Sequence, residues 1–442
     1  MSTDRFKSGS SRLGRGPDGV PLTRRGLLRW SAAAAAAAAL PAWAAPAAAG
    51  EDGDDGGYGA AFLAAVAQDR RIRAYTEPGR EFWYRPGELL TARADARRVA
   101  AWLREAGVPF RGGKPFGSVE RFLLGADADI PGLVARLREP GQWAGGVPPA
   151  VQPHHVLVGF DNIMGNPGTG PVAVAAPKPP GTGSGAGKGV TVGICDTGIW
   201  RDAASFHPDW LGNAYLPEAD DEDALYQYAD VLALQAGHGT FVAGVLRTSA
   251  PDVRFDPEVA LSGMGIGDEE MLVGAVDRLE RRVSIINLSL GCRTQDDVAP
   301  LPLADRVAAL GREVLVVAAA GNAGGSRPAW PAALPDVLAV AAVHATEEGP
   351  APAAYSNFGQ WVDACADGTR VSTYVTGVLD VKGAKPERFE GFARWSGTSF
   401  AAPHVAGRIA ALMSEKSLTA ADAADVLLNQ RRWHPDYGVL VS

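Results

Sequence analysis

Cysteine is scarce in this 442-residue chain, which contains only Cys195, Cys292 and Cys365. Three cysteines are too few for a disulfide-stapled scaffold, and their spacing matches no zinc-binding pattern. Cys195 ends an apolar run and is expected to be an inert buried thiol. A Cys292–Cys365 disulfide stays open, because sequence alone does not give the separation of the two residues.

Runs of lysine and arginine are absent outside the N-terminus. The chain has 42 basic and 50 acidic residues, a net charge of −8, and its first 30 residues carry seven basic against two acidic side chains. The remainder is therefore clearly acidic, so neither nucleic acid nor an anionic membrane surface is expected as a partner. Hydrophobic residues make up 46% and charged residues 21%, the composition of an ordinary globular protein.

The one long, weakly apolar run lies near the N-terminus. Arg24 and Arg25 precede an alanine-rich stretch that closes with Ala47-Ala48-Ala49. Residues 1–49 therefore resemble a twin-arginine signal peptide, which directs a folded protein to the cell envelope or exterior of a prokaryote. A transmembrane anchor is the alternative, but alanine is only weakly apolar and two prolines interrupt the run. We expect no anchor after signal cleavage.

The rest of the chain divides by composition into three segments. Residues 50–160 contain predicted strands and helices in the order of a small α+β unit, at 88–92, 94–106, 119–125, 130–138 and 155–160. Residues 161–188 are rich in glycine and proline and predict an exposed linker. Residues 189–442 alternate strands (190–195, 284–290, 314–319, 337–343) with helices (240–246, 269–281, 303–311, 400–416). This pattern predicts an α/β domain with a mostly parallel sheet covered by helices.

Four motifs lie at predicted strand ends or helix starts, where such sheets bind ligands. They are DTG at 196–198, HGTFVAG at 238–244, AAGN at 319–322 and GTSFAAPHVAG at 397–407. Ser399 begins a helix, so its hydroxyl and N–H point to a place that favours an oxyanion. Asn322 offers a second oxyanion donor.

In this order the four motifs resemble those of the subtilisin-like serine proteases. The chain order Asp, His, Ser differs from that of chymotrypsin and of the α/β-hydrolases, which excludes an esterase of the latter fold. The resemblance implies a subtilisin-like three-layer α/β fold with a mostly parallel central sheet. It also implies that the α+β unit 50–160 is a propeptide; a retained accessory domain is the alternative.

The resemblance assigns roles to individual residues. Ser399 would attack the scissile carbonyl, His238 would act as the base, Asp196 would orient His238, and Asn322 would stabilise the oxyanion. The residues that would bind substrate are Ser289, Leu290 and Gly291, which pair with its backbone, and Ala318, Ala319, Ala320, Gly321 and Ala329, which line the specificity pocket. His207 and His404 are expected to be packing residues.

Three sequence features bear on specificity and metal binding. The family commonly has an acidic residue shortly before Gly237; here Leu234-Gln235-Ala236 precede it, a departure expected to alter substrate subsites. Ala329 would leave room for a large apolar side chain, whereas Asp296-Asp297 would favour a basic one. Calcium often stabilises the family, but no full ligand set is recognisable: the acidic residues 220–223 are the candidate, with a solvated loop as the alternative.

The sequence therefore predicts an exported, monomeric serine endopeptidase that is made as a zymogen and needs no cofactor for its chemistry. Its partners would be a polypeptide substrate and its own propeptide. A narrow-specificity maturation protease for co-exported peptides is one alternative. A non-hydrolytic binding protein on the same fold is the other.

Overall fold

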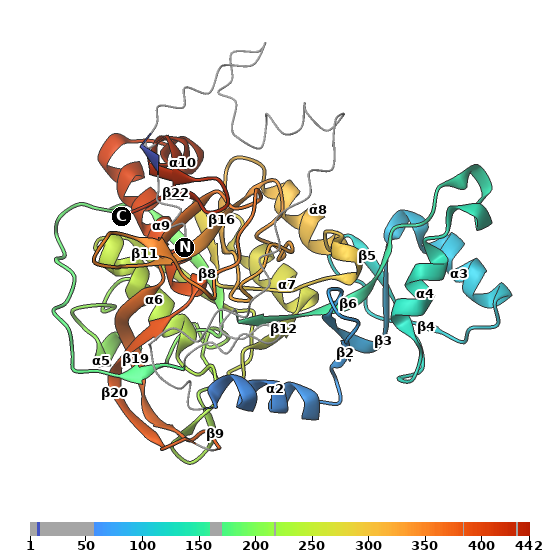
Figure 1. Cartoon of the computed structure of the whole chain (residues 1–442), viewed down its shortest axis with the longest axis horizontal. Coiled ribbons are helices and arrows are strands. Elements are labelled where there is room, and N and C mark those ends of the chain that lie inside the picture. Colours follow the sequence, from blue (N-terminus) through green and yellow to red (C-terminus); the bar gives the residue numbers. More distant parts are fainter. Residues whose placement is uncertain (1–6, 9–56, 160–169, 216–217, 383, 430–431) are drawn as a thin grey trace, which may run out of the picture.

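A computed structural model describes residues 7–8, 57–159, 170–215, 218–382, 384–429 and 432–442. Nearly all of the predicted signal peptide and the first part of the predicted linker lie outside these residues. Within the described part of the chain, no helix combines the length and the apolar character needed to cross a membrane. Figure 1 shows a large body and an N-terminal lobe (residues 57–159), whose helices α3 (Ala96–Glu105) and α4 (Ile130–Leu137) project at one side.

The body is built on a ten-stranded sheet with a parallel centre. Seven neighbouring strands run parallel, in the order β11, β8, β13, β15, β16, β18, β22. Their bounds are β8 Thr191–Asp196, β11 Arg254–Val259, β13 Ile285–Leu288, β15 Leu315–Ala319, β16 Val337–His344, β18 Ala364–Asp367 and β22 Gly438–Leu440. Three short antiparallel strands complete it: β1 Lys7–Ser8, β17 Ala351–Pro352 and β21 Arg432–His434.

Helices cover both faces of this sheet. Along β8, Val192 and Ile194 belong to one core cluster and Cys195 to another, so alternate side chains are buried on opposite faces. The first cluster includes residues of α6 (His238–Ser249) and α9 (Thr398–Lys416); the second includes residues of α7 (Glu269–Leu279) and α8 (Leu301–Leu310). Two further helices are α5 (Ala203–Phe206) and α10 (Ala420–Leu428). The predicted three-layer α/β fold is confirmed.

A second sheet of the body escaped the sequence prediction. Its long hairpin, β19 (Thr369–Leu379) and β20 (Glu387–Ser396), is joined by β7 (Val172–Ala173), β9 (Tyr226–Tyr228) and β10 (Val231–Leu232). β7 lies within the segment predicted to be an exposed linker, and Asp252 accepts hydrogen bonds from the N–H groups of Gly183 and Gly185. From residue 170 onward this segment is therefore attached to the body, because its backbone groups find partners there.

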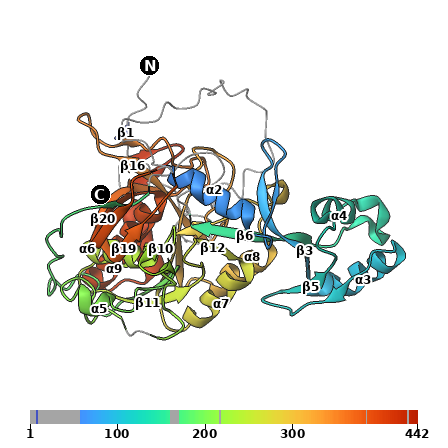
Figure 2. The same cartoon turned by 90° about the horizontal axis from the view of Figure 1, so that it is seen from below.

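The N-terminal lobe has the predicted alternation of strands and helices. Its elements are α2 Tyr58–Gln68, β2 Arg73–Tyr75, β3 Phe82–Ala92, α3 Ala96–Glu105, β4 Arg111–Gly112, β5 Val119–Leu123, α4 Ile130–Leu137 and β6 Val151–Gly159. α3 and α4 bury apolar side chains against the sheet, in a core of the lobe's own. α2 was not predicted. In both views it lies away from α3 and α4, against the body (Figures 1 and 2), where Tyr58 and Phe62 join the body's core.

β6 connects the lobe to the body through main-chain pairing. It is antiparallel to β3 in the lobe and to β12 (Ile266–Asp268) and β14 (Leu290–Gly291) in the body. One seven-stranded sheet therefore runs through both parts of the molecule. Figure 1 shows β6 leaving the lobe and extending into the body beside β12.

Candidate active site

The carboxyl end of β8 and the first turn of α6 bring Asp196 and His238 together. His238 Nδ1 lies 2.7 Å from Asp196 Oδ1, which also accepts the Thr197 N–H at 2.7 Å. Both side chains are fully buried. Because Nδ1 donates to a carboxylate, the basic position of the imidazole is Nε2.

A glycine permits the close approach of the two elements. A Cβ on Gly239 would lie 2.0 Å from the carbonyl oxygen of Gly198, so only glycine fits where α6 meets the loop after β8. Across the same junction, Thr197 Oγ1 accepts the Gly239 N–H at 3.2 Å. The DTG and HGT motifs are thus packed backbone against backbone.

Ser399 occupies the first turn of α9, as the sequence predicted. Ser289 Oγ donates to the Ser399 carbonyl at 2.8 Å, and Ser399 Oγ lies 3.4 Å from the Ser289 carbonyl oxygen. The neighbouring Phe400 ring packs against the His238 ring, with centroids 5.3 Å apart. The three residues far apart in sequence, Asp196, His238 and Ser399, therefore meet in one place.

Asn322 is held in a fixed orientation just after β15. Its Oδ1 accepts the Thr398 N–H at 2.9 Å and the Thr398 hydroxyl at 2.8 Å. The hydroxyl of Thr398 in turn accepts the Gly321 N–H at 3.0 Å. Oδ1 accepts from α9, and the amide nitrogen is the atom of this side chain that can donate.

The residues predicted to bind substrate lie on β14, at the end of β15 and next to Cys292. Leu290 and Gly291 form β14 and pair with β6, while Ser289 precedes them and touches Ser399. Leu288 pairs with Ala318, which places β15 and the segment through Ala319, Ala320 and Gly321 beside the end of β13. Ala329 is buried beside Trp330, whose N–H and C=O exchange hydrogen bonds with Cys292 at the end of β14.

Comparison with known proteins gives one consistent result. The subtilase family (Peptidase_S8) matches residues 187–438, more than half of the chain. The chain belongs to the subtilase family. Members of this family are serine endopeptidases.

Individual relatives of this subtilase agree in fold and differ in length. A thermophilic serine proteinase of Bacillus sp. (strain AK1) is 33% identical over 239 residues, 51% of this chain and 53% of the relative. Thermitase of Thermoactinomyces vulgaris is 29% identical over 274 residues, 59% of this chain and 86% of thermitase. The chain thus spans about half the length of the first relative. Fervidolysin of Fervidobacterium pennivorans, a keratinolytic enzyme related to subtilisin, superimposes with a TM-score of 0.57 at 19% identity, covering 84% of this chain and 61% of fervidolysin.

The acidic residues 220–223 do not form a wholly solvated loop, the alternative to a calcium site, because Asp221 and Asp223 are buried. Asp223 is buried, and its Oδ2 accepts the Thr197 hydroxyl at 2.8 Å and the Gly237 N–H at 2.7 Å. It therefore links the residue after Asp196 to the residue before His238. Burial raises the pKa of Asp223 to about 7, although these two hydrogen bonds act to lower it.

The same loop contributes to one acidic group that could hold a cation among the described residues. Carboxylate oxygens of Glu218, Asp221 and Asp256 lie within 4.8 Å of one another. Calcium requires six to eight oxygen ligands, but Arg282 already pairs with both Glu218 and Asp256. The residues present do not fit a calcium site, and the positive charge in this cluster comes from arginine.

Other predicted features have structural roles. All three cysteines are free and buried, and burial raises the pKa of each thiol. His207 bonds the Tyr374 carbonyl, and His404 bonds Ser249, as expected of packing residues. Asp296 pairs with Arg80 and Arg138, and Asp297 pairs with Arg327. The acidic pair is therefore neutralised by arginines, two of them from the N-terminal lobe.

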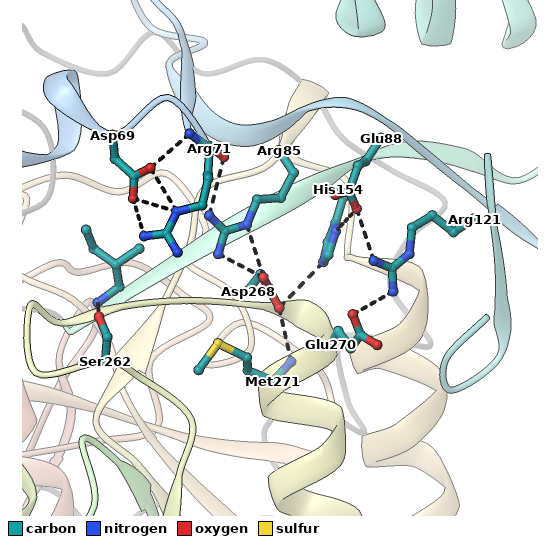
Figure 3. Close-up of polar contacts among 11 residues, drawn as sticks. Asp69, Arg71, Arg85, Glu88, Arg121, His154, Ser262, Asp268, Glu270 and Met271 are labelled. Atoms are coloured by element: carbon teal, nitrogen blue, oxygen red, sulfur yellow. Dashed lines mark hydrogen bonds and ion pairs between the residues drawn. The ribbon is translucent and has the colours of Figure 1, made fainter. Parts of the chain in front are cut away.

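Ion pairs hold the lobe against the start of α7 (Figure 3). Asp268 receives two hydrogen bonds from Arg85, at 3.0 and 2.8 Å, while its other oxygen caps α7 through the Met271 N–H. Arg121 bridges Glu88 of the lobe and Glu270 of α7. Burial acts to raise the pKa of Asp268, but the charges of His154 and Arg85 outweigh it and lower that pKa. The lobe is thus docked by charge as well as by β6.

Replacing Asp223 by Asn should change how stability depends on pH. The folded protein holds a proton on Asp223 up to about pH 7, whereas the unfolded chain releases it near the ordinary aspartate pKa of 3.8. The free energy of unfolding therefore falls as the pH rises between these values, and asparagine escapes this loss. The test compares Ser399→Ala protein with and without Asp223→Asn. The melting temperature of the Asp223→Asn protein minus that of its parent should be at least about 3 °C larger at pH 8 than at pH 5.

The control for this experiment is Asp209→Asn, a substitution at an exposed carboxylate. Its melting temperature relative to the parent should be the same at both pH values. A pH-independent difference for Asp223→Asn would show that Asp223 is ionised in the folded protein across the whole range.

Proposed function

We propose that this chain is an exported serine endopeptidase made as a zymogen, with Ser399 as nucleophile and residues 50–160 as its propeptide. The observation that carries this proposal is the 2.7 Å contact between His238 Nδ1 and Asp196 Oδ1, next to Ser399 at the start of α9. Family membership supports the reaction class, and the orientation of Asn322 supports an oxyanion site.

The proposed reaction has two steps. As Ser399 Oγ bonds to the scissile carbonyl carbon, its proton passes to His238 Nε2, and Asp196 stabilises the resulting imidazolium. The Asn322 amide and the Ser399 N–H bind the oxyanion. His238 then gives the proton to the leaving amine as the C–N bond breaks. Water, deprotonated by His238, cleaves the acyl–Ser399 ester and regenerates the hydroxyl.

β6 supports the zymogen part of the proposal. It lies antiparallel between β12 and β14, as an extended peptide substrate would when it adds a strand to a sheet edge. While β6 occupies the space between β12 and β14, no other peptide can pair with these two strands. Residues 161–188 would then join the propeptide to the peptidase domain 189–442, and cleavage in that region would release the lobe.

Two alternatives remain distinct from a general endopeptidase. A maturation protease for co-exported peptides would have the same machinery and a narrower groove. A non-hydrolytic binding protein would keep the fold and would not need Ser399. The hydrogen bond between Asp196 and His238 argues against this alternative.

Replacing Ser399 by Ala should abolish self-processing. Wild type expressed without residues 1–49 should lose its N-terminal lobe and hydrolyse casein, because Ser399 supplies the nucleophile. Ser399→Ala should keep its full mass, with hydrolysis reduced at least about 10⁴-fold. Ser205→Ala, at an exposed serine, is the matched control. Intact-mass spectrometry and casein hydrolysis provide the readouts; an active Ser399→Ala protein would refute the assignment.

Replacing Asn322 by Ala should slow turnover while leaving substrate binding nearly intact. One oxyanion donor is typically worth about 10²–10³-fold in kcat, since it acts on charge that develops only in the transition state. Steady-state kinetics should show a lower kcat with KM changed by less than about threefold. Asn429→Ala, at an exposed asparagine, should match wild type. An unchanged kcat for Asn322→Ala would remove Asn322 from the proposed machinery.

Replacing Arg24 and Arg25 together by Lys should stop export, because the twin-arginine route depends on the arginine pair. The full-length protein should then accumulate in the cytoplasm with residues 1–49 attached, as measured by cell fractionation and N-terminal mass. Arg12→Lys and Arg15→Lys together, upstream of the pair, should export normally. Normal export of the Arg24, Arg25 variant would contradict the proposed route.

A further inference from the structure

Asp223 lies between the two motifs that carry Asp196 and His238, although it belongs to neither. It is buried and comes from the segment between α5 and β9. Its Oδ2 accepts the Gly237 N–H at 2.7 Å and the Thr197 hydroxyl at 2.8 Å. A single carboxyl oxygen therefore contacts the residue directly after Asp196 and the residue directly before His238.

Thr197 extends this contact to the other side of His238. Its N–H donates to Asp196 Oδ1 at 2.7 Å, and the same oxygen lies 2.7 Å from His238 Nδ1. Because Asp223 takes the one proton of the Thr197 hydroxyl, the lone pairs of that oxygen are available as acceptors, and they receive the Gly239 N–H at 3.2 Å. Asp223 thus fixes the backbone before His238 directly and the backbone after it through Thr197.

The turn before His238 has no side chain of its own that could hold it. Gly237, the N-cap of α6, has a φ of 75° and makes no side-chain cap, and a Cβ there would lie 2.8 Å from Val375 Cγ1. Residues 234–236, which precede it, contain no carboxylate. The carboxyl group that a helix N-terminus favours is supplied instead by Asp223, fourteen residues earlier than Gly237.

Asp223 fills this role as a hydrogen-bond acceptor and does not need to be charged. Its Oδ1 has no hydrogen-bond partner among the described residues, and burial raises its pKa to about 7. The charged groups that act on it are Asp196, which raises this pKa, and His238, which lowers it. Below pH 7 the carboxyl is therefore neutral, and its Oδ2 still accepts both hydrogen bonds. The amide oxygen of asparagine can do the same.

We propose that Asp223 is a positioning residue of the catalytic assembly. Its two hydrogen bonds set the orientation of His238 toward Ser399. This inference rests on the proposed endopeptidase function and adds to it a residue that touches neither the substrate nor the reacting atoms. Asp223 acts on kcat, because a small displacement of the base slows proton transfer and leaves the contacts with the substrate in place.

The test compares two substitutions at Asp223 by steady-state hydrolysis of casein at pH 6. Each variant is first freed of its lobe by immobilised wild-type enzyme, which is then filtered off. Asp223→Leu keeps the branched shape and loses both oxygens, so kcat per folded protein should fall about 10²-fold with KM changed by less than about threefold. Asp223→Asn keeps an acceptor, so its kcat should stay within about threefold of wild type. Near-ultraviolet circular dichroism measures the folded fraction.

Thr197→Val tests the same link from its other end, and it decides the question if Asp223→Leu does not fold. Valine has the shape of threonine and lacks the hydroxyl, so kcat should fall at least about 10-fold with KM nearly unchanged. The double variant Thr197→Val, Asp223→Leu should lie within about threefold of the slower single variant, because both substitutions remove one link. Asp209→Leu, at an exposed carboxylate, is the control and should match wild type.

The outcomes distinguish this inference from the function on which it rests. If Asp223→Leu or Thr197→Val keeps the wild-type kcat per folded protein and only melts at a lower temperature, Asp223 is a stabilising residue alone. The inference is then overturned and the endopeptidase function stands. A loss of kcat in Asp223→Asn as large as in Asp223→Leu also overturns it, since the acceptor is retained. If wild type hydrolyses no casein, the proposed function fails and the inference fails with it.

Discussion

The main-chain pairing of β6 with β12 and β14 is the interaction on which the rest of the structure depends. It joins the sheet of the N-terminal lobe to the edge of the body, next to Ser289 and the serine it contacts. Backbone hydrogen bonds fix the register of β6 against these two strands, and the register decides which side chain of β6 meets which part of the body. The docking of the lobe and the position of β6 between two strands of the body both follow from this one alignment.

The catalytic candidates owe their positions to the parallel sheet. Its neighbouring strands end at the same edge, so the loop after β8, the segment after β15 and the start of α9 converge there. A buried polar network makes the convergence rigid: Thr197 connects Asp223 to α6, and Thr398 orients Asn322.

Charge is distributed unevenly between the two contacts that hold the lobe. At the start of α7, ion pairs such as Arg85–Asp268 are largely hidden from solvent and reinforce a helix cap. α2 instead uses buried apolar side chains and the Tyr58 hydroxyl, which donates to the Leu234 carbonyl at 2.6 Å. Screening by salt acts on charges and not on apolar burial, and it acts only weakly on a pair as buried as Arg85–Asp268.

The sequence by itself determined the α/β class and the parallel sheet, and it named four candidate catalytic residues, because short motifs at strand ends and helix starts depend on local chemistry. It also determined the strand–helix order of the lobe. Only the tertiary structure revealed the β19–β20 hairpin, the attachment of the linker, the buried state of Asp221 and Asp223, and the role of α2. These features depend on partners far away in sequence: Asp223 is buried only because Thr197 and Gly237 meet there. A local pattern of acidic residues carries no information about that meeting.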